Sequence, residues 1–145
     1  MAFVFPSSGT LLSGFCGALI LLASFSCHPD NSPASQAQAL SDRIDSLHEA
    51  TMNKVAPLRR LQDSMRAEIA VAVATQADTT AFSDALQQLQ QGDTAMFGWM
   101  GRYDMDYKGK NDSDKVVYLQ SQVNQLQQID HAIDQALQTA EGLLH

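Results

Sequence analysis

The chain has 145 residues, of which 45% are hydrophobic and 17% charged, and its formal net charge is −7. This length suits one ordinary domain and is too short for a two-domain enzyme, while the apolar fraction is too high for a disordered tail. Because sixteen acidic residues outweigh nine basic ones, the charge balance argues against a nucleic-acid-binding protein.

The first residues have the pattern of an export signal. An apolar stretch runs from Leu11 to Phe25; it is shorter than the about 20 residues of a membrane-spanning helix and fits the apolar region of a signal peptide. It ends at Ser26-Cys27, a small residue before a cysteine, which resembles a bacterial lipobox. We therefore expect residues 1–26 to be a lipoprotein signal peptide and Cys27 to carry a lipid. An ordinary cleaved signal and an uncleaved anchor are the alternatives.

Export with cleavage before Cys27 leaves no free thiol in the chain, because Cys16 departs with the signal and Cys27 is lipidated. No disulfide framework, zinc thiolate site or cysteine nucleophile is then expected. Residues 27–36 include two prolines and several small polar residues, which predicts a flexible tether between lipid and domain. The expected location is the bacterial cell envelope, facing the periplasm or the cell surface.

In residues 37–145 the hydrophobic spacing is helical. Three helices are predicted, over about residues 35–76, 80–107 and 112–144. Pro57 cannot donate a hydrogen bond to the Asn53 carbonyl, so we expect a kink in the first helix. Gly109 is expected to end the second helix and Asn111 to cap the third. Since short loops join antiparallel neighbours, we predict an all-α, up-down-up antiparallel three-helix bundle with coiled-coil-like packing.

Soft metal ligands recur at helical spacing in the first two predicted helices. His48 and Met52 are four residues apart, as are Met96 and Met100, and Met105 follows one turn further on; the predicted hairpin places all of them in the half nearest the tether. Imidazole and thioether ligands favour Cu(I) or Ag(I), and the neighbouring Trp99 could act as a cation–π lid. The set looks like the methionine–histidine–tryptophan sites of periplasmic copper and silver chaperones. The alternative is that the methionines fill the core and His48 bonds a neighbour.

Two aspartates interrupt the hydrophobic seams of the second and third predicted helices. An isolated buried carboxylate is costly, so Asp93 and Asp130 each need a partner, and Arg60 or its neighbour Arg59 is predicted to pair with Asp93. We interpret Asp93, Asp130 and Arg60 as a polar layer that fixes the register of the bundle. A general acid/base pair made of the two aspartates is the alternative interpretation.

Three glycines, Gly92, Gly98 and Gly101, fall within the second predicted helix. Each costs about 1 kcal/mol relative to alanine in a helix interior. They indicate a close approach of another backbone or a locally soft segment around Trp99, unless the packing simply tolerates them.

Short segments spread along the chain carry a family resemblance: LHEATM at 47–52, LRRL at 58–61, AMFGWM at 95–100 and AEGLL at 140–144. On these, the chain resembles a family of small bacterial lipoproteins often called "viral A-type inclusion protein". The family's first segment tends to read His-Asp-Glu-Val-Met, whereas Glu49 and Ala50 follow His48 here. The resemblance implies a lipoprotein and a helical bundle, and it implies no activity.

Together these patterns predict a non-enzymatic helical module, anchored to the membrane through Cys27, that binds another envelope protein or its own copies. A soft-metal binding or relay protein, using Cu(I) or Ag(I) on His48, Met52, Met96 and Met100, is the second hypothesis. An enzyme using Asp93 and Asp130 is the third.

Overall fold

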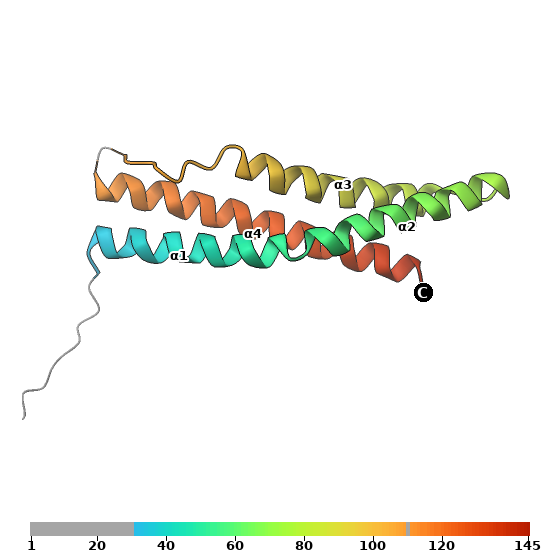
Figure 1. Ribbon diagram of the computed structural model, residues 1–145, viewed down its shortest axis with the longest axis horizontal. Coiled ribbons are helices and arrows are strands. Elements are labelled where there is room, and N and C mark those ends of the chain that lie inside the picture. The colour runs from blue at the N-terminus through green and yellow to red at the C-terminus, as the bar shows by residue number, and fades with distance from the viewer. Residues whose placement is uncertain (1–30, 110) are drawn as a thin grey trace, which may run out of the picture.

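The computed structural model describes residues 31–109 and 111–145, and every regular element in these segments is helical. The helices are α1 (Pro33–Met52), α2 (Val55–Ala74), α3 (Thr80–Met100) and α4 (Asp112–Leu143) (Figure 1). None of these helices has the length and apolar character needed to span a membrane. The expected signal peptide and the lipid site at Cys27 lie outside the described residues, as does the first part of the expected tether.

The helices confirm the predicted three-helix bundle. α1 and α2 follow one another as a single broken rod, α3 returns beside this rod, and α4 runs along both (Figure 1). α4 packs on α1 and on α3, while α2 packs mainly on α3. We call the half that holds α1, the end of α3 and the start of α4 the proximal half.

The first predicted helix is broken rather than kinked, which corrects the expected continuous element. The break lies at Asn53 and Lys54, where the Asn53 N–H donates to the Glu49 carbonyl (3.1 Å) and the Lys54 N–H to the Thr51 carbonyl (3.0 Å). This places Pro57 in the first turn of α2. Backbone N–H groups in the first turn of a helix have no intrahelical acceptor. A proline there therefore costs no helical hydrogen bond, although it has no N–H to donate.

The second predicted helix is shorter than expected, because α3 ends at Met100 and residues 101–109 form an irregular connection. Gly98 and Gly101 flank this end and weaken the helix. Gly109 therefore does not end α3 but lies in the connection, with φ of +59°. The predicted cap of the next helix is confirmed, since Oδ1 of Asn111 accepts a hydrogen bond from the Asp114 N–H (3.0 Å).

Gly92 marks a close approach between α3 and its neighbours. A Cβ atom there would lie 2.9 Å from Cγ1 of Ile133 and 3.4 Å from Cδ1 of Leu58, both buried core side chains. At Gly98 a Cβ atom would meet the end of the flexible Arg102 side chain (3.2 Å). The close-approach interpretation therefore holds for Gly92 and not for Gly98.

Candidate functional site

The candidate site is a pocket between α1 and the end of α3, in the proximal half of the bundle. Its volume is about 250 Å³, just below the roughly 300–1,000 Å³ range of small-molecule sites. It is lined by Ile44, Asp45, His48, Trp99, Met100, Tyr103 and Met105. Ile44 and Trp99 are almost fully buried, whereas Met100 is 38% and Met105 81% exposed. A small group could therefore enter past the two methionines and rest on the buried side chains.

The pocket exists because α1 and α3, both fully described, are held apart. Each packs on α4, but no Cα atom of α1 lies within 8 Å of one in α3. Side chains bridge the gap instead: the rings of His48 and Trp99 face each other at a tilt of 34°, with centroids 6.0 Å apart. The groove between the two helices is thus partly filled by side chains and partly open.

A column of stacked rings supports one wall of the pocket. Trp99 stacks on Tyr103 (4.9 Å between centroids), Tyr103 faces Tyr118 (6.4 Å), and Tyr118 stacks on Tyr107 (4.2 Å). The indole N–H of Trp99 also donates to Oε1 of Gln122 at 3.1 Å. Such aromatic pairs add about 0.5–1.5 kcal/mol each beyond the area they bury. The column therefore holds the pocket wall in a defined position.

The Asp45 carboxylate gives the α1 side of the pocket a negative charge. Asp45 makes no hydrogen bond or ion pair with any described residue. Burial raises the pKa of the Tyr103 phenol, and the charge of Asp45 raises it further, although a hydrogen bond with Ser41 acts in the opposite direction. The Asp45 carboxylate thus acts on the phenol of the aromatic wall while its own bonding capacity is unused.

The structure brings together only some of the expected metal ligands. His48 and Met100 line the pocket, joined by Met105 from the connection after α3. Met96 is fully buried, and Met52 packs, partly buried, against the core, so neither lines the pocket. Side chains four residues apart differ in direction by about 40°, which is enough to send Met96 into the core and Met100 to the surface.

Trp99 is part of the wall rather than an open lid. Its side chain is 2% exposed and lies between His48 and Tyr103. Within the described residues, the cation–π contact is a different one, Arg59 over the ring of Phe97 at 5.2 Å. Those residues also contain no group of three or more His, Cys, Asp or Glu side chains placed to share a metal ion.

The two seam aspartates have separate partners. Asp93 pairs with Arg59 at 3.3 Å, whereas the exposed Arg60 side chain is not its partner, which corrects the expected polar layer. The carboxylate of Asp130 contacts Nζ of Lys54 at 2.7 Å and accepts from Oγ1 of Thr51 at 2.9 Å. The described side chains therefore form two polar clusters, not one shared layer or a bonded carboxylate pair.

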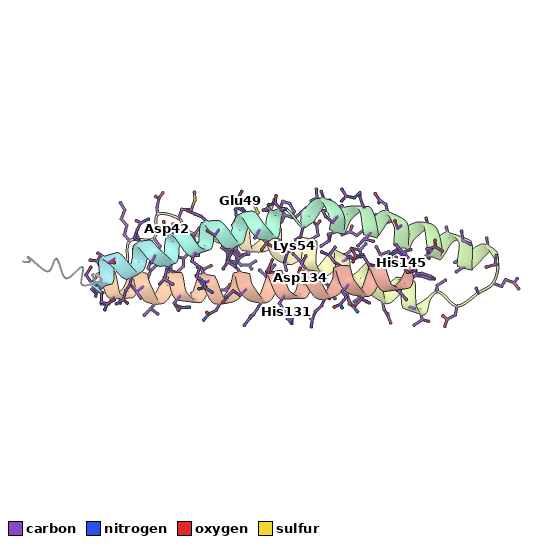
Figure 2. The ribbon with its side chains drawn as sticks, turned by 90° about the horizontal axis from the view of Figure 1, so that it is seen from below. Asp42, Glu49, Lys54, His131, Asp134 and His145 are labelled. Atoms are coloured by element: carbon purple, nitrogen blue, oxygen red, sulfur yellow. The ribbon has the colours of Figure 1, made fainter. Side chains whose placement is uncertain are left out.

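Lys54 is the centre of the larger cluster, a role that the hydrophobic spacing of the sequence does not predict. Its ammonium group also contacts Asp134 at 2.6 Å, and Figure 2 shows the two residues beside each other at mid-bundle. Burial lowers the pKa of Lys54, but hydrogen bonds and charges from Asp130 and Asp134 outweigh it and raise the pKa overall. A lysine three residues before Pro57, where the proline interrupts the predicted helix, is the signal that could have revealed this arrangement of Lys54, Asp130 and Asp134, which we call the Lys54 clamp.

Comparisons with known proteins give no assignment: no family model matches the chain, and no curated protein or solved structure matches it significantly. The pocket and the side chains around it are therefore the features from which a function is inferred.

Proposed function

We propose that this protein is an exported, lipid-anchored helical module of the bacterial cell envelope that binds a partner without catalysing a reaction. The observation that carries the proposal is the proximal pocket, with its buried floor and its exposed Met100 and Met105. Methionine side chains are flexible and polarizable and are common at surfaces that accept partners. The partner is another envelope protein or a second copy of this chain.

A structural role for the seam aspartates also supports a binding function over catalysis. Asp93 is engaged by Arg59 of α2, and Asp130 by Lys54 at the break between α1 and α2. Such pairs fix which residues face each other in a bundle. In the proximal pocket, by contrast, the Asp45 carboxylate has no bonding partner among the described residues.

Photocross-linking in cells tests partner binding directly. A photoreactive residue is placed at position 105, beside the pocket, in the full-length chain. His131, which is exposed on α4 (Figure 2), is the matched control position. We expect a discrete adduct from position 105 and none from position 131. No adduct, or equal adducts from both positions, rejects a partner at the pocket.

The lipid anchor is tested separately by feeding cells a labelled fatty acid. We expect the wild-type chain and Cys16→Ser to become labelled, because Cys16 lies within the expected signal peptide. Cys27→Ser is expected to lose the label. Absence of label from the wild type, or label that persists in Cys27→Ser, excludes lipidation at this position.

A soft-metal site is the second candidate function, because His48, Met100 and Met105 line the same pocket. One imidazole and two thioethers form a donor set that favours Cu(I) or Ag(I). Titration with Ag(I) is followed by the fluorescence of Trp99, the sole tryptophan. Stoichiometric quenching that is lost in His48→Ala and kept in Met52→Leu supports the site; no response at excess Ag(I) rejects it.

A further inference from the structure

We propose that the proximal pocket recognises an organic cation, meaning an ammonium or guanidinium group carried on a short hydrocarbon body. This inference rests on the proposed function, because it names the chemistry that the binding pocket accepts. The group is either the head of a free amine or the end of a basic side chain on the partner.

The charge around the pocket favours a cation. Asp45 lines the pocket and has no bonding partner among the described residues. Asp42 and Glu49 are exposed on the same helix (Figure 2). They lie three residues before and four residues after Asp45, a spacing that places the three acids along one stripe of α1. The lining contains no lysine or arginine. A ligand with a positive charge is thus attracted, and an anion is repelled.

The rest of the lining favours hydrocarbon. Ile44, the ring of Trp99 and the thioether of Met100 line the same pocket as the carboxylate and give it apolar walls. Trp99 and Tyr103 stack on each other, so part of their ring faces is already covered, and the attraction for the cation comes mainly from Asp45. The volume of about 250 Å³ suits one small apolar body rather than a large ligand.

Burial of the hydrocarbon body and the ion pair with Asp45 contribute separately to the binding free energy of the ligand. The hydrocarbon alone confers weak binding that does not depend on Asp45. The carboxylate adds a charge-assisted hydrogen bond, which is moderated by solvent because Asp45 is exposed. A charged ligand is therefore preferred to a neutral one of the same shape, and this preference requires Asp45.

The first arm of the test uses phenethylamine as the cation and phenethyl alcohol as its neutral counterpart. Each is titrated against the full chain in neutral detergent, with Trp99 fluorescence and calorimetry as readouts. We expect the amine to bind and Asp45→Asn to weaken it by roughly three- to tenfold. Asp42→Asn, one turn away and bonded to Gln38, is the control and should leave binding unchanged.

The second arm repeats the cross-linking from position 105 with the same two variants, and distinguishes the source of the cation. If the amine does not bind, but the adduct is lost in Asp45→Asn and kept in Asp42→Asn, the cation is a basic side chain of the partner. If the amine binds with dependence on Asp45, a free amine is a ligand. Both results support the proposal.

The proposal is overturned if neither amine binding nor the adduct depends on Asp45. An adduct that persists in Asp45→Asn then leaves the proposed binding function in place and removes only its cation chemistry. If the amine does not bind and no adduct forms, both the cation chemistry and the proposed binding function are rejected.

Discussion

Lys54 and Asp130 form an ion pair of 2.7 Å that joins the break between α1 and α2 to the middle of α4. The same ammonium group contacts Asp134 one turn further along α4. The pair therefore fixes where the broken rod sits along α4. Charged partners that are partly buried contribute more to this kind of specificity than exposed ones, because removing one partner leaves the other uncompensated.

Lys54→Met is expected to lower the free energy of unfolding by about 1–3 kcal/mol, because Asp130 and Asp134 then face each other without a cation. Urea denaturation followed by helical circular dichroism measures the change. Lys108→Met, on an exposed side chain of the connection after α3, is the control and should change stability by less than about 0.5 kcal/mol. Equal effects of the two substitutions would show that the clamp does not stabilise the fold.

The clamp also predicts how stability depends on alkaline pH. Because the folded protein raises the pKa of Lys54 above its ordinary 10.5, the stabilisation is complete below that pH and is lost as pH rises through the folded pKa. The difference in unfolding free energy between wild type and Lys54→Met should therefore shrink above pH 10.5. Urea titrations at neutral and alkaline pH measure this, and a difference that stays constant contradicts it.

Gly92→Ala is expected to destabilise the protein even though alanine favours helix by about 1 kcal/mol. The new methyl group would lie 2.9 Å from Cγ1 of Ile133, and overpacking of this kind typically costs about 1–3 kcal/mol. Gly98→Ala is the matched control on the same helix, where the methyl group meets only a flexible arginine end. It should be neutral or stabilising. Thermal unfolding of both variants tests this, and equal melting temperatures contradict it.

The fold followed from the sequence wherever local signals were sufficient. The sequence predicts a helix over about residues 112–144, and α4 spans Asp112–Leu143, because its apolar period is continuous and Asn111 provides a side-chain cap. The break before Pro57 was expected only as a kink. A proline specifies which hydrogen bond is missing, but the position of the break also depends on the contacts that Lys54 makes with α4.

The candidate site was predictable only in part, because it depends on register between helices. A short turn joins α2 to α3, so the sequence narrows the partner of Asp93 to Arg59 or Arg60, and the structure pairs it with Arg59. One residue rotates a side chain by about 100° around a helix. α1 and α4 are not consecutive in the chain, so no short turn fixes which of their residues face each other. The partner of Asp130 therefore cannot be deduced from the sequence. Met105 lies outside any helix, where spacing gives no direction.

The aromatic wall of the pocket provides a final prediction, in which Asp45→Asn lowers the pKa of Tyr103. Burial is the largest cause of the raised pKa and persists in the variant, so the pKa should remain above the ordinary 10.0 while losing the part due to the Asp45 charge. Tyrosinate absorbance during alkaline titration measures it, in a Tyr107→Phe, Tyr118→Phe background that leaves one tyrosine. Asp42→Asn in the same background is the control and should shift the titration less. An unchanged titration in Asp45→Asn would mean that the carboxylate does not act on the pocket wall, and it would weaken the case for Asp45 as the anchor of a bound cation.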